Sequence, residues 1–386
     1  MKPRPPSHSL ARLPVSTLLA VGGFCVLWIV LGSQIVPGAR KHDFLNLYTG
    51  GSLALDGNFR HMDSPDVQLS RERQFVPELN ALVPFVRLPF YALFLAPLAL
   101  IPFGPAFWVW LAFQSSLLVA CWIWALRRWG PDAVIFGAMF LPTALGIAHG
   151  QDCVLMLAIV VAAYALSEEN RDLAAGIALG AGLIKFHLFL AWPVALLIQK
   201  RWRMLIGSAI MVAAELLLSL ILAGPAGLNQ YFALLRKKDI EHLNPSPELM
   251  INLHGMAMNL GLNTIAVRGL LVALVLAIAA AACWRAPWWR SIAAVSIASL
   301  TIAPHVYGYD AGLLLLSVWL GIFVCTDKWT RIAATLVATP LPYLMTLAGS
   351  PWAAATPIAL LLWLALLSFR RPAPALAAAP LSPQPL

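Results

Sequence analysis

Long apolar segments recur from one end of this chain to the other, and they constrain its fold more than any other feature. The first of them, Val15 to Val36, is long enough as a helix, at about 1.5 Å per residue, to cross a bilayer core of about 30 Å. Apolar residues make up 60% of the chain and charged residues only 11%, a composition that a soluble domain does not need. The sequence therefore predicts an all-α polytopic membrane protein.

Most of the apolar segments have the length of a membrane span. We expect about twelve spanning helices, at residues 15–36, 106–127, 132–148, 152–167, 172–187, 188–199, 203–223, 262–284, 288–304, 309–325, 329–347 and 353–369. The first has too long an apolar core for a cleaved signal peptide, which has about 7–15 such residues, so we expect an uncleaved anchor. Pro89 to Ile101 is also apolar but reaches only about 20 Å as a helix. Its flanking prolines favour a re-entrant or interfacial segment.

The distribution of charge gives the orientation. If Pro89 to Ile101 does not span, one side of the membrane collects fifteen basic and five acidic residues. The basic ones are Lys2, Arg4, Arg12, Arg127, Arg128, Arg171, Lys200, Arg201, Arg203, Arg285, Arg290, Lys328, Arg331, Arg370 and Arg371; the acidic ones are Asp132, Glu168, Glu169, Asp172 and Asp327. The rest of the chain carries eleven basic and twelve acidic residues. Because positive loops mark the cytoplasm, both termini are predicted to be cytoplasmic in a multi-pass protein of the cell (inner) membrane.

This topology divides the chain into two tails and one transmembrane domain. Residues 1–14 form a cytoplasmic tail, residues 15–371 a single domain, and the Pro/Ala-rich residues 372–386 a disordered cytoplasmic tail. An extracytoplasmic loop, 37–105, is expected to contain the re-entrant segment and a short interfacial helix before Gly57. A second outer loop, 225–253, has the pattern of an amphipathic helix on the membrane surface.

The cysteine spacing and the net charge favour neither a metal or disulfide framework nor nucleic-acid binding. The five cysteines have no metal-ligand spacing and fall in or beside apolar segments, so buried apolar packing is the expected role and no disulfide framework is implied. A net charge of +9 can indicate nucleic-acid binding, but in a membrane protein it reports loop topology. Membrane lipids are therefore expected partners and nucleic acid is not.

Ionisable and polar residues gather at the predicted outer ends of the helices. Ionisable groups at membrane depth are costly, which makes them candidates for function. They are Asp43 after the first helix, His149, Gln151 and Asp152 in one turn, Lys185 and His187 at the end of the fifth helix, His254 and Arg268 near the eighth, and His305, Tyr307, Tyr309 and Asp310 between the ninth and tenth.

Each of these residues also has an ordinary structural explanation. Asp152 or Asp310 can cap the helix that follows it, and Lys185 can extend its ammonium group to the interface. His187 and His254 fit a structural or peripheral role. No single residue decides between structure and function. What indicates a function is that all of these residues lie on the same predicted side of the membrane.

A carboxylate and a cationic cluster on one face suit a particular reaction. In a displacement at a sugar carbon, a carboxylate such as Asp43 takes the proton of an acceptor hydroxyl. Cations such as Lys185, His305 and Arg268 stabilise the charge that builds on a departing lipid phosphate. A lipid-linked donor would enter from the bilayer, which explains the many membrane helices.

Several motifs resemble those of glycosyltransferase family 87. They are Asp43-Phe-x-x-x-Tyr48 with Gly50-Gly-x-Leu-x-Leu-x-Gly57, the proline-rich run from Pro84 to Pro102, Gly150-Gln151, Gly176-x-x-x-Gly180-x-x-x-x-Lys185, and Pro304-His305 with the following tyrosines. The resemblance covers residues 40–325, and the motifs occur in the family's order.

The resemblance implies a GT-C fold and a polyprenyl-phosphate-sugar donor, with mannose as the expected sugar and a lipid or glycan hydroxyl as acceptor. It implies that Asp43 is the general base and that Lys185 and His305 lie near the donor phosphate. We assign Arg268 to the phosphate as well, and Tyr48, His149, Gln151, Asp152, His254, Tyr307, Tyr309 and Asp310 to substrate binding. Asp43 and Asp152 could share a cation, but no cofactor or metal is required, and catalysis is predicted to be metal-independent.

Two other classes remain as alternatives. A transporter or lipid-linked-sugar flippase predicts polar residues strung through the membrane and an internal repeat, neither of which is evident in the sequence. A non-catalytic membrane scaffold leaves the polar cluster unexplained. If Asp43, Lys185 and His305 share one outer cavity, catalysis is favoured.

Overall fold

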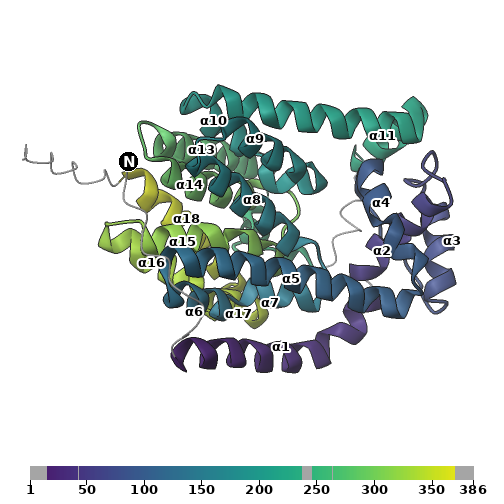
Figure 1. Ribbon diagram of the computed structural model, residues 1–386, viewed down its shortest axis with the longest axis horizontal. Helices are drawn as coiled ribbons and strands as arrows, with labels where there is room; N and C mark the ends of the chain where they lie inside the picture. The colour runs from purple at the N-terminus through teal and green to yellow at the C-terminus, as the bar shows by residue number, and fades with distance from the viewer. Residues whose placement is uncertain (1–14, 42, 237–245, 263, 370–386) are drawn as a thin grey trace, which may run out of the picture.

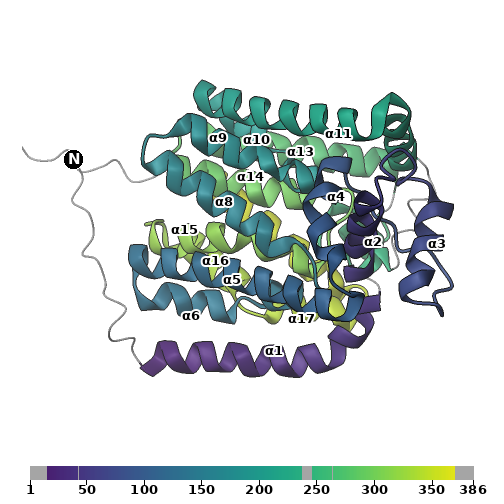
Figure 2. The ribbon, with the colours of Figure 1, turned by 45° about the vertical axis from the view of Figure 1, so that its right-hand side comes forward.

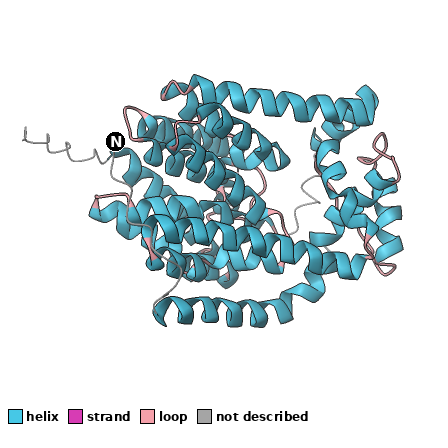
Figure 3. Ribbon diagram, viewed as in Figure 1, coloured by secondary structure: helices cyan, strands magenta, loops and turns pink. Residues whose placement is uncertain are grey.

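The computed structural model describes residues 15–41, 43–236, 246–262 and 264–369. Within these ranges the chain is helical and contains no β-strand (Figure 3). Both predicted tails and residues 237–245 of the predicted second outer loop lie outside the described residues.

The helices of the first half are mostly apolar, with the polar helix Pro65–Phe75 as an exception. In the following, α marks an α-helix and η a 3-10 helix. The elements are α1 Val15–Lys41, α2 Asp43–Leu55, α3 Pro65–Phe75, α4 Pro89–Leu95, η1 Ala96–Leu100, α5 Phe103–Trp129, α6 Pro131–Met139, α7 Leu141–Ala148, α8 Cys153–Glu168, α9 Asp172–Gly180, η2 Ala181–Phe189 and α10 Trp192–Ile198.

The second half is built in the same way. Its elements are α11 Trp202–Arg236, η4 Pro247–Leu249, α12 Leu253–Asn259, α13 Ile265–Cys283, α14 Trp288–Ile302, η5 Gly308–Leu314, α15 Leu315–Phe323, α16 Lys328–Ala338, α17 Leu341–Met345, η6 Thr346–Ala348, η7 Trp352–Ala354 and α18 Ala355–Phe369.

Local sequence signals explain where many of these helices begin. Proline opens α3, α4 and α6, where its missing N–H is not needed. Side chains of Asn252, Thr264 and Asp327 accept hydrogen bonds from the first turns of α12, α13 and α16. Helix α11 is broken at Gly224-Pro225, and its last part continues as a helix to Arg236 with Tyr231 buried. The position of this part on the membrane surface stays a prediction.

Five helices in the described part are long and apolar enough to cross a membrane, and seven if each of two bent pairs counts as one span. The five are Phe103–Trp129, Asp172–Phe189, Trp202–Arg236, Ile265–Cys283 and Trp352–Phe369; the bent pairs are Pro131–Met139 with Leu141–Ala148 and Lys328–Ala338 with Leu341–Ala348. The protein is therefore a helical membrane protein, and the count of twelve spans stays a prediction.

The helices form a bundle with a smaller helical region at one end. In Figures 1 and 2, α2, α3 and α4 lie together at one end of α1, α5 and α11. The predicted outer loop 37–105 is thus an ordered part of the fold. Helix α2 packs against α4 and η1, and its residues from Phe44 to Ala54 are buried apart from half-buried Asn46. It is covered by protein more fully than an interfacial helix would be.

Close helix packing explains one of the glycine motifs. Helices α9 and α11 lie against each other, and a Cβ atom on Gly176 would lie 2.0 Å from the backbone oxygen of Met204. Only glycine lets the two backbones approach this closely, as small residues do between membrane helices. This contact fixes α9 and the η2 segment that follows it, which carries Lys185.

Candidate functional site

A cavity of about 940 Å³ lies between the small helical region and the bundle. Five parts of the chain, far apart in sequence, contribute its walls: the start of α2, the 76–87 segment, the turn before α8, the η2 segment and the 304–310 loop, with Leu235 of α11 at one side. Of the predicted site residues, those that line it are Asp43, Gln151, Lys185, His305, Tyr307, Tyr309 and Asp310.

Asp43 is the first residue of α2, and its carboxylate is held by two partners. Gln151 Nε2 donates a hydrogen bond of 2.8 Å to Oδ1, and His149 Nδ1 lies 2.9 Å from Oδ2. The Asp43 side chain remains one-quarter exposed. A carboxylate that is oriented by neighbours and still accessible from a cavity has the geometry of a general base.

Both partners of Asp43 belong to the tight turn between α7 and α8. Gly150 has φ +67°, a conformation that suits glycine, and a Cβ atom there would approach Phe107 and Phe44 to 3.0 and 3.2 Å. Trp110 Nε1 donates a 2.8 Å hydrogen bond to the Gly150 carbonyl. The turn is therefore fixed in the shape that points His149 and Gln151 at Asp43.

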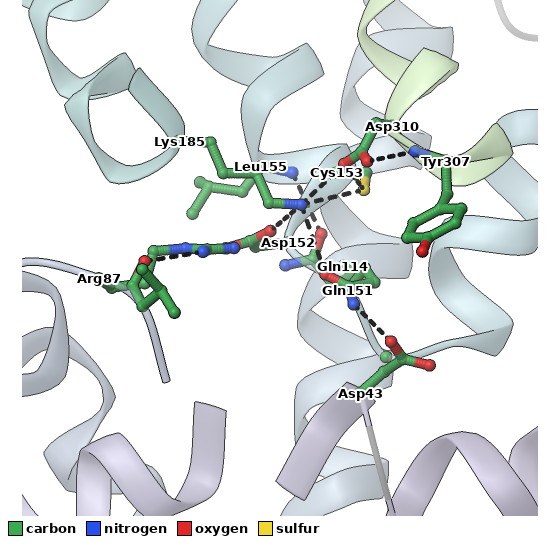
Figure 4. Close-up of polar contacts among 12 residues, drawn as sticks. Asp43, Arg87, Gln114, Gln151, Asp152, Cys153, Leu155, Lys185, Tyr307 and Asp310 are labelled. Atoms are coloured by element: carbon green, nitrogen blue, oxygen red, sulfur yellow. Dashed lines mark hydrogen bonds and ion pairs between the residues drawn. The ribbon is translucent and has the colours of Figure 1, made fainter. Parts of the chain in front are cut away.

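Lys185 lies at the centre of a buried ionic network (Figure 4). The backbone of η2 is non-helical at this residue, with φ −126° and ψ 60°. Its Nζ atom lies 2.8 Å from Asp152 Oδ1 and 2.9 Å from Asp310 Oδ1, and 3.4 Å from the amide oxygen of Gln151. The ammonium group is thus paired inside the protein and does not extend to the interface.

Arg87 is the second cation of this network. Its NH2 lies 3.6 Å from Asp152 Oδ2, on the other side of that carboxylate from Lys185. The fully buried Asp152 carboxylate therefore has a cation on each side, Lys185 and Arg87. Asp152 precedes α8 and makes no side-chain capping bond to it.

The 304–310 loop supplies an aromatic wall. The rings of His305 and Tyr307 are 5.0 Å apart, and those of Tyr307 and Tyr309 are 5.8 Å apart. Burial lowers the pKa of His305 to about 4, so its imidazole is neutral at pH 7 and can donate one hydrogen bond. Asp310 Oδ2 accepts a hydrogen bond from the Tyr307 backbone N–H, so Asp310 closes this turn as well as pairing with Lys185.

Five predicted site residues are not part of the cavity wall. His149 and Asp152 lie behind it, in contact with Asp43 and Lys185. Tyr48 is buried, where its hydroxyl donates to the Ile101 carbonyl and its ring packs on Phe75 and Phe103. Neither His254 in α12 nor Arg268 in α13 is among the described residues that line the cavity.

Several lining residues were not predicted from the sequence. Arg87, Lys41 and Glu78 come from the charge-balanced outer loop, and for Lys41 and Glu78 nothing in the pattern separates them from other surface charges. Lys41 and Glu78 pair with each other. His187, expected to be structural or peripheral, lines the cavity. Arg87 has one usable signal, because it stands alone between two apolar stretches.

Within the described ranges, no group of three His, Cys, Asp or Glu side chains lies close enough together to hold a metal ion. Independence from metals stays a prediction that an assay has to test.

Comparison with known proteins gives one match. Residues 85–325 match the family model described as Glycosyltransferase family 87. This range covers more than half of the chain and contains Arg87, the 149–152 turn, Lys185 and the 304–310 loop, while Asp43 precedes it. No curated protein and no solved structure matches the chain.

Proposed function

Since the chain belongs to glycosyltransferase family 87, we propose that it is an inverting enzyme that uses a polyprenyl-phosphate-sugar donor. The expected sugar is mannose, and the acceptor is a hydroxyl group of a lipid or glycan. The observation that carries this proposal is the position of Asp43 on the wall of a cavity whose other walls carry Arg87, Lys185 and His305.

The chemistry follows from these positions. The acceptor hydroxyl attacks the anomeric carbon and forms the new C–O bond, while its proton passes to the Asp43 carboxylate. The bond between the anomeric carbon and the phosphate oxygen breaks, and its electron pair leaves with the lipid phosphate. Because one displacement occurs, the configuration at the anomeric carbon inverts.

The phosphate side of the cavity is supported by charge and by hydrogen-bond donors. Arg87 and Lys185 bring two positive charges to the cavity, of which Lys185 is already paired with Asp152 and Asp310, and the imidazole of His305 lines the same cavity. Groups that are already in place stabilise a developing phosphate charge without reorganisation during the reaction.

The remaining walls suit a lipid chain. Apolar side chains of the 76–87 segment, Phe186 and Leu235 line the cavity beside these polar groups. We place the cavity at the extracytoplasmic face of the cell membrane, with both termini cytoplasmic, because the basic loops cluster at the opposite ends of the helices.

A transporter or flippase fits these observations less well. The polar residues of the site line a single cavity, whereas a transport path needs polar residues through the membrane. Family membership also favours transfer over transport.

A direct assay tests the proposal. Purified protein in nanodiscs is incubated with polyprenyl phosphates carrying radiolabelled mannose, glucose or arabinose, together with total membrane lipid. We expect label from one donor to appear in a new lipid or glycan product with inverted configuration. If none of these donors gives a product while the protein stays folded, the proposed function is wrong.

A further inference from the structure

We propose that Arg87 is the residue that binds the donor's phosphate group, and that Lys185 is an internal counter-ion for two aspartates. This inference rests on the proposed function, because it names the contact that such a donor would make. It differs from the sequence-based expectation, which gave the phosphate to Lys185, His305 and Arg268.

Lys185 has no donor left for a ligand. An ammonium group carries three N–H donors, and Nζ is within 2.9 Å of carboxylate oxygens of both Asp152 and Asp310. Gln151 Oε1 at 3.4 Å and Cys153 Sγ at 3.7 Å complete its surroundings. The side chain is 4% exposed. A phosphate could reach this nitrogen only by displacing one of the aspartates.

Arg87 has donors to spare. A guanidinium group carries five N–H donors, of which NH1 donates to the Val86 carbonyl at 3.0 Å and NH2 faces Asp152 at 3.6 Å. Its Nε atom is buried and has no hydrogen-bond partner among the described residues, so the donors offered to a ligand are the remaining N–H groups of NH1 and NH2. The side chain is 16% exposed, lines the cavity, and points across it toward the Asp152–Lys185 pair (Figure 4).

The charges of the network allow Arg87 to turn to a ligand at low cost. Asp152 and Asp310 carry two negative charges, and Lys185 and Arg87 carry two positive ones. Asp152 is held at 2.8 Å by Lys185 and only at 3.6 Å by Arg87, so it keeps its closer partner when the guanidinium pairs with a phosphate. A planar guanidinium can also bind two phosphate oxygens at once, which an ammonium cannot.

The wall that carries Arg87 is itself held in place by α3. Gln68 Nε2 donates to the Phe85 carbonyl at 3.1 Å, and the Phe85 N–H donates back to Gln68 Oε1 at 2.8 Å. One turn further along α3, Glu72 Oε2 accepts from the Val83 N–H at 3.1 Å. Both α3 side chains are fully buried. The segment is therefore fixed two residues before Arg87, although it belongs to no regular element.

The test uses farnesyl phosphate as a short polyprenyl phosphate and farnesol as its uncharged counterpart. Binding of each to purified protein in detergent is measured for the wild type, Arg87→Ala, Arg87→Gln and Arg60→Ala. Arg60 is an exposed arginine of the same outer region and serves as the matched control. Inorganic phosphate as a competitor shows how much of the affinity comes from the headgroup alone.

We expect Arg87→Ala to weaken farnesyl phosphate binding by about tenfold or more, the range for a lost charge-assisted hydrogen bond. Farnesol binding should not change, and Arg60→Ala should bind like the wild type. The unfolding temperature of Arg87→Ala should fall less than that of Lys185→Met, because Asp152 keeps its closer partner Lys185 at 2.8 Å. If Arg87→Ala does not fold, Arg87→Gln keeps a polar side chain without the charge and gives the same comparison.

Two results would overturn the assignment. One is farnesyl phosphate binding in the Arg87 variants that equals the wild type, and the other is an equal loss of farnesyl phosphate and farnesol. Either leaves the proposed function intact if the wild-type protein transfers sugar. A wild-type protein that neither prefers farnesyl phosphate over farnesol nor transfers sugar would instead reject the proposed function.

Discussion

The Nδ1 atom of His149 lies 2.9 Å from Oδ2 of Asp43, although 106 positions separate the two residues in the chain. Asp43 lines the cavity, whereas the ring of His149 lies behind it and packs against Tyr309 at 5.2 Å. We therefore infer that His149 orients the Asp43 carboxylate, which is the base of the proposed reaction.

His149→Ala is therefore expected to lower kcat by about a hundredfold, the scale for a misplaced reacting group, with little change in KM for the donor. Gln151→Ala should act in the same direction, because it removes the hydrogen bond to the other oxygen of Asp43. His61→Ala, at an exposed histidine of the outer region, is the control. Wild-type kcat in the His149 variant would show that Asp43 needs no such support.

The network around Lys185 predicts a large effect on stability. Lys185→Met leaves Asp152 and Asp310 buried with one cation fewer, and removal of one partner from a buried ion pair costs about 3–5 kcal/mol. Lys200→Met, at an exposed lysine, should cost little. Chemical denaturation in detergent measures both, and the second substitution Asp152→Asn should recover part of the loss. Equal stabilities for the two single variants would contradict the network.

The buried Glu72 side chain, which accepts a hydrogen bond from Val83 of the cavity wall, predicts that the stability of the protein depends on pH. Burial raises the pKa of Glu72 to about 7, against an opposing hydrogen bond from Val83. Between pH 4.5 and 7 the folded protein then binds more protons at this site than the unfolded chain, so stability falls as pH rises through this window. Asp63, with a pKa raised to about 7 by burial, acts in the same direction.

Glu72→Gln keeps an oxygen that can accept the Val83 hydrogen bond and removes the ionisation. We expect the fall in unfolding temperature between pH 5 and pH 8 to shrink by a few degrees, on the order given by a change of 1–2 kcal/mol. Asp66→Asn, at an exposed carboxylate of the same helix, should leave the slope unchanged. An unaltered slope in Glu72→Gln would show that Glu72 is already ionised in the folded protein.

Removal of metal ions is predicted to leave sugar transfer unchanged. Asp43 is held by His149 and Gln151, and Asp152 by Lys185 and Arg87, so both carboxylates already have partners. Transfer is measured after dialysis against a chelator and again after addition of Mg²⁺ or Mn²⁺. A loss of activity that one of these ions restores would require a metal-dependent reaction.

Much of the fold could be predicted from the sequence because long apolar runs dominate it. Helices such as Phe103–Trp129 and Ile265–Cys283 fall where hydropathy and their flanking charges set them. The bends at Met139–Leu141 and Ala338–Leu341 could not be predicted with the same ease, because they depend on packing as well as on the prolines beside them. The burial of α2 could not be predicted either, because its pattern of apolar residues also fits a helix that lies on a membrane surface.

The candidate site was predictable where a polar residue interrupts an apolar run. Lys185 and Asp310 stand out for this reason, and the structure brings their side chains to 2.9 Å. Arg87 also interrupts an apolar run, but the even charge balance of its loop hides this signal, and its neighbours in space come from distant parts of the chain, the N-terminus of α8 and η2. Arg268 was predicted to bind the phosphate because it is a charged residue near the end of an apolar helix, but it is not among the described residues that line the cavity.

The central claim is that the Asp43 carboxylate accepts the proton of the acceptor hydroxyl. Asp43→Asn keeps the size of the side chain and a hydrogen-bonding oxygen but removes the base. In the nanodisc assay we expect sugar transfer to fall by about a thousandfold, while the unfolding temperature and farnesyl phosphate binding stay at wild-type values. Wild-type transfer by a folded Asp43→Asn protein would contradict the account.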